Sequence, residues 1–341
     1  MIKRILPAEW APQSAVQLTF PHAGTDWADV LEQVMPCFVE IASSIARFQK
    51  VLIVCNNPDE VRGLFQADSH FSNFRFVQAP CNDTWARDHS GITILENERP
   101  VVLDFVFNGW GLKFPAFYDN LITGYIQRNH QVFNAEIRHG GLVLEGGAIE
   151  SDGQGTLLTT AECLLSPNRN PHLSKAEIEA KLKSLFGLDR VLWLHHGYLA
   201  GDDTDSHIDT LARFCDPETI AYVQCTRADD EHNDALRNME AELAAFRTAT
   251  GKPYRLVPLP MPDACYDDDG HRLPATYANF LIINGAVLTP TYGVPQDAEA
   301  LTLIQTCFPD RKIIGIDCRA LILQHGSLHC VTMQYPEGVC N

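Results

Sequence analysis

Short runs of β-branched and aromatic residues alternate along the chain with longer amphipathic stretches, the pattern of an α/β protein. The longest helix is predicted over 28–49, where Val30, Val34, Phe38 and Ile41 share one face. Further helices are predicted over 175–186, 229–248 and 296–307. Strands are predicted over 15–20, 51–55, 74–78, 91–95, 101–107, 142–149, 156–160, 191–194, 207–214, 220–225, 254–259, 279–283, 286–291, 312–316 and 327–334.

This order of elements predicts about five strand–strand–helix–strand units. No linker rich in Gly, Ser or Pro and no block of like charge separates them. We therefore expect one domain over residues 1–341, with 45% hydrophobic residues supplying an ordinary globular core.

The chain carries 43 acidic and 26 basic residues, for a formal net charge of −17. Nucleic acids and anionic membranes bind basic surfaces, so neither is an expected partner. An acidic field attracts cationic ligands, although it also simply keeps a protein soluble.

The 11 cysteines are irregularly spaced, and none form a Cys-x-x-Cys pair. The first apolar segment is too short for a secretory signal, and no apolar run approaches the ~20 residues of a membrane helix. A cytoplasmic protein with reduced thiols is the expectation.

Three segments place polar residues beside strand-like runs, where binding residues are often held. In the first, over 82–91, Asp88 follows Arg87, and the two could also form an ordinary ion pair. In the second, over 201–211, His207 and Asp209 would share one face of a strand, as in an acid/base pair or a metal half-site. The carboxylates of 202–205 lack the spacing of an EF-hand.

The third segment, over 325–334, contains Cys330. A strand cysteine is usually a small core residue. Cys330 differs because Gly326 and Ser327 precede it and His329 adjoins it, which leaves room for a ligand. Together with a His and an Asp elsewhere, Cys330 becomes a candidate nucleophile.

At these segments the sequence resembles the agmatine deiminases, within the guanidine-modifying enzymes that include the peptidyl-arginine deiminases. The matching strings follow in order along nearly the whole chain. They are Pro7-Ala8-Glu9-Trp10, Phe20-Pro21-His22, Trp27, Trp85-x-Arg87-Asp88, Phe107-Asn108-Gly109-Trp110-Gly111, Leu144-Glu145-Gly146-Gly147, Thr159-Thr160-x-Glu162-Cys163, Asn168-Arg169-Asn170-Pro171, Asn279-Phe280-Leu281-Ile282, Pro290-Thr291-Tyr292 and His329-Cys330-Val331-Thr332.

The resemblance implies a five-bladed α/β propeller (pentein) of strand–strand–helix–strand units with pseudo-fivefold symmetry and a central active site. Two departures concern fine substrate preference. Ser206 stands where the family usually has Gly before the motif histidine, and His325-Gly326-Ser327-Leu328 replaces a run of glycines.

The resemblance also implies roles. Cys330 would attack the guanidinium carbon, and Asp88 and Asp209 would hold the guanidinium through charge-assisted hydrogen bonds. His207 would protonate the leaving ammonia and then activate water, and Glu145 would orient His207, although Glu145 could equally be a structural turn acid. Because carboxylates surround it, Cys330 is expected to depend on the cationic substrate for its activation.

Substrate preference would come from the far end of the molecule. Agmatine carries an ammonium there, and Asp203 would favour it while repelling the carboxylate of arginine. Trp85 and Trp110 would line the methylene chain or stack on the cation, unless both are core residues.

The expected reaction converts agmatine to N-carbamoylputrescine and ammonia through a covalent amidino-cysteine, in putrescine biosynthesis or agmatine catabolism. No cofactor or metal is expected, and a homodimer is implied by resemblance alone. The alternatives are a peptidyl-arginine deiminase, an amidinotransferase, a metal-dependent hydrolase built on His207, Asp209 and the carboxylates of 202–205, and a non-catalytic polyamine-binding module.

Overall fold

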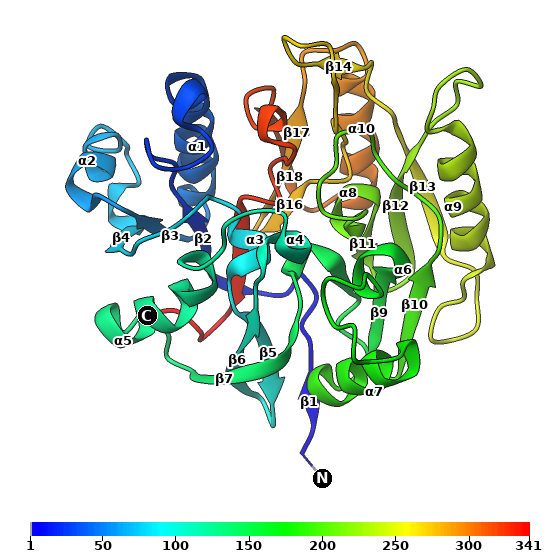
Figure 1. Cartoon of the computed structure of the whole chain (residues 1–341), viewed down its shortest axis with the longest axis horizontal. Helices are drawn as coiled ribbons and strands as arrows, with labels where there is room; N and C mark the ends of the chain where they lie inside the picture. The colour runs from blue at the N-terminus through cyan, green and yellow to red at the C-terminus, as the bar shows by residue number, and fades with distance from the viewer. Residues whose placement is uncertain (1) are drawn as a thin grey trace.

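The computed structural model describes residues 2–341 and has a mixed α/β fold (Figure 1). Within these residues, five sheets repeat one pattern, in which an antiparallel strand pair is followed by a parallel pair. In each of the five sheets, the chain forms at least one helix between two parallel strands, because a parallel pair needs a long crossover connection. The predicted strand–strand–helix–strand units are therefore present.

The strands group as follows. The sheets consist of β19 (Thr332–Pro336), β2 (Gln13–Thr19), β3 (Lys50–Cys55) and β4 (Phe74–Gln78); β1 (Arg4–Ile5), β5 (Ile92–Glu96), β6 (Arg99–Val106) and β7 (Glu136–Val143); β10 (Arg190–Leu194), β9 (Thr156–Thr160) and β8 (Ile149–Ser151); β11 (Ala212–Asp216), β12 (Thr219–Gln224) and β13 (Arg255–Pro260); and β16 (Leu281–Ile283), β17 (Ala286–Thr291) and β18 (Lys312–Asp317). A separate hairpin pairs β14 (Cys265–Tyr266) with β15 (Arg272–Leu273).

The longer helices lie at the outside of the molecule, and several one-turn helices lie nearer its middle (Figure 1). The outer helices are α1 (Leu31–Ala46), α2 (Pro58–Gly63), α5 (Ile122–His130), α7 (Lys175–Phe186), α9 (Asn233–Ala245) and α10 (Asp297–Cys307). The short ones are α3 (Ala86–His89), α4 (Gly109–Leu112), α6 (Ala161–Leu164), α8 (Ile208–Leu211), and the 3-10 turns η1 (Ala28–Val30), η2 (Phe71–Asn73), η3 (Asp119–Leu121), η4 (Gly146–Ala148) and η5 (Ile322–Gln324).

The two ends of the chain meet in one sheet. Strand β19, near the C-terminus, pairs antiparallel with β2, near the N-terminus. This pairing fixes the segment just before β19, which contains Cys330, beside residues from the first part of the chain; the backbone N–H of Arg87 donates to the carbonyl of Cys330 at 3.1 Å.

Three predicted strands are wrong at the places that matter for function. Residues 208–211 of the predicted strand 207–214 form the helical turn α8, so His207 and Asp209 do not share a strand face. The predicted strand 142–149 is interrupted by the 3-10 turn η4. In this turn Gly146 packs against the backbone carbonyl of Arg87, and Gly147 packs against His207. Strand β19 begins only at Thr332, so Cys330 lies in the preceding turn.

Buried apolar side chains form three clusters between the sheets and the helices that cover them. In β3, for example, every residue from Val51 to Cys55 is buried, as expected of an inner strand covered on both faces. Among the helices of residues 2–341, none is long and apolar enough to cross a lipid bilayer.

Candidate active site

An acidic cavity brings together segments that are far apart in the sequence. Five of the predicted site residues line it. They are Trp85, Asp88, Trp110, Asp203 and Cys330. Asp26 and Asp83 add two more carboxylates to its wall.

His207 and Asp209 converge on Asp88 at one point beside this cavity, although neither lies on a strand. A methyl group built on Gly147 would lie 2.6 Å from His207 Nδ1, 2.8 Å from Asp88 Oδ1 and 3.2 Å from Asp209 Oδ2. Only glycine fits here, because any side chain would collide with all three groups. The turn η4 thus explains why the sequence has Gly147 at this position.

Asp88 is held by two donors and has no lysine or arginine partner among residues 2–341. The backbone N–H of Gly147 donates to its Oδ1 at 2.9 Å, and the indole N–H of Trp110 donates to its Oδ2 at 3.0 Å. Arg87 does not pair with Asp88; its Nη2 lies 3.7 Å from Glu9 instead. Burial and the nearby Asp209 raise the pKa of Asp88 well above its usual range. A cation in the cavity would relieve this cost.

His207 is buried beside Asp88. Its Nδ1 lies 3.6 Å from Asp88 Oδ1. Within residues 2–341, neither ring nitrogen has a hydrogen-bond partner. Burial lowers the pKa of His207 to about 3, so the ring is neutral in the empty cavity. A neutral imidazole with free nitrogens can accept and return a proton.

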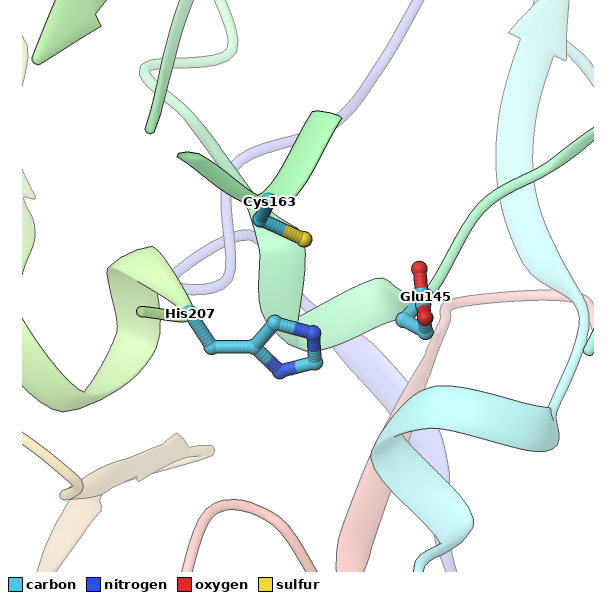
Figure 2. A group of neighbouring side chains, drawn as sticks. All are labelled: Glu145, Cys163 and His207. Atoms are coloured by element: carbon cyan, nitrogen blue, oxygen red, sulfur yellow. The ribbon is translucent and has the colours of Figure 1, made fainter. Parts of the chain in front are cut away.

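Glu145 lies beside His207, together with Cys163 (Figure 2). The donor atoms of the three side chains lie within 4.8 Å of one another, yet no hydrogen bond joins Glu145 to His207 among the described residues. The Nε–H of Arg169 donates to both oxygens of Glu145, at 2.8 and 3.1 Å. Arg169 therefore fixes Glu145 next to the imidazole. Burial still raises the pKa of Glu145 despite this pairing.

Glu145, Cys163 and His207 offer the kinds of donor that bind zinc. A metal ion there would have to share Glu145 with the buried guanidinium of Arg169. A second group of possible donors consists of Glu9, Glu150 and His329. Both glutamates of this group form ion pairs with Arg213.

The carboxylates of 202–205 stabilise their own loop. Asp202 accepts hydrogen bonds from Thr204 and from the backbone N–H of Ser206. Asp205 pairs with Lys113 at 2.7 Å and with Arg169 at 2.6 Å. Neither group of possible metal donors in residues 2–341 includes Asp209 or these loop carboxylates.

Cys330 lines the acidic cavity and is 4% exposed. The amide Nδ2 of Asn279 lies 3.3 Å from its Sγ, and Asp209 Oδ2 lies 3.9 Å away. Burial, Asp209 and Asp88 raise the pKa of the Cys330 thiol well above its usual value. The thiol is therefore neutral in the empty cavity, as expected from the surrounding acids, and a bound cation would favour the thiolate.

Asp203 lies at the mouth, with its side chain 41% exposed and 4.0 Å from the Nε2 of His325. Lys113 donates to the backbone carbonyl of Asp203 at 2.6 Å and so ties this loop to the segment after α4. His325, one of the two departures from the family pattern, has a left-handed backbone with φ of 66°. Its Nδ1 bonds the carbonyl of Gly201 at 2.8 Å, which places the imidazole beside Asp203.

The two tryptophans are both core residues and cavity walls. Their rings meet edge to face, with centroids 6.3 Å apart. Trp85 donates its indole N–H to Asp83 at 2.9 Å, as Trp110 does to Asp88. The indole rings therefore provide apolar walls while their polar edges fix the carboxylates.

Three supporting residues were not identified from the sequence, namely Asn279, Arg169 and His329. Asn279 accepts the backbone N–H of His329 at 2.8 Å and contacts the Cys330 sulfur. Arg169 holds Glu145, and His329 contacts Asp209 at 2.7 Å. Each lies in a string that carried the family resemblance, and each is a buried polar residue; that combination is the signal that could have revealed it.

The family model for Porphyromonas-type peptidyl-arginine deiminase matches residues 5–336. Among solved structures, a Porphyromonas gingivalis protein with the provisional name arginine deiminase is 55% identical, with a TM-score of 0.95, over 99% of this chain and 100% of that one. A cysteine-to-serine variant of the C. jejuni agmatine deiminase, with substrate bound, is 38% identical, with a TM-score of 0.93, over 99% of this chain and 97% of that one.

A curated relative from Stutzerimonas stutzeri, named agmatine deiminase, is 31% identical over 97% of this chain and 95% of its own length. The matches cover the whole set of segments that build the acidic cavity. The chain thus belongs to the Porphyromonas-type peptidyl-arginine deiminase family, together with the agmatine deiminases.

Proposed function

We propose that the chain is an agmatine deiminase, which hydrolyses agmatine to N-carbamoylputrescine and ammonia through an amidino group carried on Cys330. One observation supports this most strongly. The buried thiol of Cys330 and the carboxylate of Asp88 line one acidic cavity, to which residues 2–341 contribute no lysine or arginine, and the neutral imidazole of His207 and the carboxylate of Asp209 lie beside it.

The two carboxylates would hold the planar guanidinium of the substrate. Asp209 Oδ1 is buried and without a partner among residues 2–341, so it can accept a guanidinium N–H. Asp88 carries a raised pKa that a bound cation would lower. The cavity therefore binds a guanidinium more favourably than a neutral urea, which helps release of the product.

The bound cation also activates the nucleophile. As the guanidinium approaches, it offsets Asp88 and Asp209, and the Cys330 proton can pass to His207. The thiolate then forms a C–S bond with the guanidinium carbon, and the C–N bond to one terminal nitrogen breaks as His207 returns the proton to it. Ammonia leaves. His207 next takes a proton from water as the water oxygen bonds to the carbon and the C–S bond breaks. The Cys330 thiolate then regains its proton from His207, and the remaining O–H proton is released to solvent as the carbonyl forms.

Glu145 would orient and stabilise His207 when it becomes charged. In the empty cavity the two groups are not hydrogen-bonded, and His207 is neutral. Protonation of His207 would create the charge that draws Glu145 to it, while Arg169 keeps the carboxylate in place. Catalytic hydrogen bonds often tighten in this way only when substrate is bound.

The repeated sheets support a five-bladed propeller with pseudo-fivefold symmetry formed by residues 1–341 as one catalytic domain. We propose a cytoplasmic enzyme without cofactor or metal, which acts in putrescine formation or agmatine breakdown and forms a homodimer. The acidic charge supports a small cationic substrate over nucleic acid.

Asp203 is proposed to select agmatine by pairing with its ammonium group at the cavity mouth. Replacing Asp203 by asparagine should raise KM for agmatine about fivefold, the effect of one partly exposed ion pair, and change kcat less. Ammonia release from agmatine, arginine and an arginine-containing peptide measures the preference. Asp229→Asn, on an exposed loop, is the matched control.

Two outcomes would contradict this assignment. Equal activity of the wild-type protein on arginine and agmatine would show that Asp203 does not select agmatine over arginine. Citrulline formation in the peptide, with agmatine untouched, would favour the peptidyl-arginine deiminase alternative.

A further inference from the structure

His329 lies between two carboxylates and touches both. Its Nδ1 is 2.7 Å from Asp209 Oδ2, and its Nε2 is 2.7 Å from Glu9 Oε2. The ring is 1% exposed, and the backbone N–H of the same residue is held by Asn279. Both contacts have the length of charge-assisted hydrogen bonds, so each ring nitrogen faces an acceptor and needs a proton of its own.

The surrounding charges decide where those protons are. Burial opposes ionisation of Glu9 and Asp209, but His329 and the neighbouring guanidiniums lower the pKa of each below its usual range. With both carboxylates ionised, only the imidazole can carry the two protons. Burial and the guanidiniums lower the pKa of His329, and the two carboxylates oppose that shift.

A protonated His329 balances the buried charge when Glu150 is ionised, because Arg87 and Arg213 then face three carboxylates. Burial raises the pKa of Glu150 to about 7. The groups that face the ring are Glu9, Glu150, Asp209, Arg87 and Arg213.

We propose that His329 is a positioning residue, an imidazolium that holds Asp209 ionised and turned toward the substrate while Glu9 holds its other edge. The contact occupies Asp209 Oδ2, which also lies 3.9 Å from the Cys330 sulfur, and Oδ1 is buried without a partner among residues 2–341. This inference rests on the proposed function, because it assigns Asp209 to the guanidinium. It extends the site to Glu9, which lines a second cavity together with His329 and Arg87.

The protonation state can be measured without any activity assay. The wild-type protein is labelled with ¹⁵N-histidine, and the ring of His329 is assigned by comparison with His329→Gln and Glu9→Gln. Two protonated ring nitrogens at pH 7 are the expected result. A neutral ring, with one nitrogen lacking its proton at that pH, would overturn the proposal even if the enzyme hydrolyses agmatine.

Kinetics test the consequence for Asp209. In His329→Gln the buried carboxylates lose a positive neighbour, so the pKa values of the Asp88–Asp209 pair rise. Activity needs these carboxylates ionised, and the acid limb of kcat/KM should therefore move to higher pH by about one unit. KM for agmatine should rise about tenfold, and this fold-change should be larger than the fold-decrease in kcat.

A surface pair supplies the control. His196 lies 3.0 Å from Glu242 outside the site, and His196→Gln should leave the pH profile unchanged. An unchanged acid limb in a folded His329→Gln protein would overturn the positioning role. Absence of agmatine hydrolysis in the wild type would instead refute the proposed function and leave the ¹⁵N measurement to judge His329.

Discussion

Replacing Cys330 by serine is expected to lower ammonia release from agmatine by about 10⁴-fold or more. A serine hydroxyl is far harder to ionise than a thiol, and Asp88 and Asp209 would oppose its negative charge as they do for the thiol. General-base help from the neutral His207 cannot make up for the weaker serine nucleophile. The carbon under attack belongs to a guanidinium, whose delocalised charge makes it resistant to weak nucleophiles. Steady-state ammonia assays at saturating agmatine measure the loss.

The matched control is Cys225→Ser. Cys225 is buried at the end of β12 and donates to the carbonyl of Arg227, a contact that serine can retain. This variant should keep wild-type activity. Retention of more than about a tenth of the activity by Cys330→Ser would contradict a nucleophilic role, since removal of a covalent nucleophile usually costs several orders of magnitude.

Replacing Asp88 by asparagine should reduce kcat/KM for agmatine by about 10³-fold. The asparagine amide keeps the shape, but one acceptor oxygen becomes a donor. That donor would face either the N–H of Gly147, the indole of Trp110 or the guanidinium of the substrate. The change also removes the negative charge on which cation binding depends. Both KM and kcat should suffer, because the guanidinium must lie flat for attack.

Asp104→Asn provides a comparison for Asp88→Asn. Asp104 is a partly buried carboxylate of β6 whose pKa burial raises to about 6, but it does not line the acidic cavity. Removing its charge should leave kcat/KM within about twofold of wild type. If Asp88→Asn behaved like Asp104→Asn, the proposed guanidinium contact would be wrong.

Several features were predictable because local chemistry determines them. The predicted helix 175–186 matches α7, where Ser174 and Glu177 form a capping box and Gly187 ends the helix with a left-handed backbone. The strand 74–78 matches β4. Five of the residues that line the acidic cavity were also predicted, four of them because the short strings that contain them stood in order along the chain.

The local geometry of the segments that contain His207, Asp209, Gly146 and Gly147 was not predictable from periodicity. His207 and Asp209 alternate as in a strand, but the segment closes into a single helical turn whose apolar residues, Ile208 and Leu211, enter the core. The interruption at Gly146 and Gly147 follows from close contact with Arg87 and His207, residues remote in sequence. Tertiary contacts outweighed local propensity at both places.

Long-range pairing explains the supporting residues that were missed. Asn279 is 51 residues from Cys330, and His329 reaches Glu9 across 320 residues. A single sequence contains no direct record of such pairs. The pairing of β19 with β2 brings these residues together in the folded chain.

The covalent intermediate provides the most direct test of the account. The wild-type protein is mixed with agmatine, quenched in acid within the first turnovers, digested and analysed by mass spectrometry. We expect the peptide that contains Cys330 to gain the mass of agmatine less ammonia, and Cys330→Ser to show no such gain. Rapid turnover of agmatine with Cys330 unmodified at every quench time, or with the adduct on another cysteine, would contradict attack by this thiol.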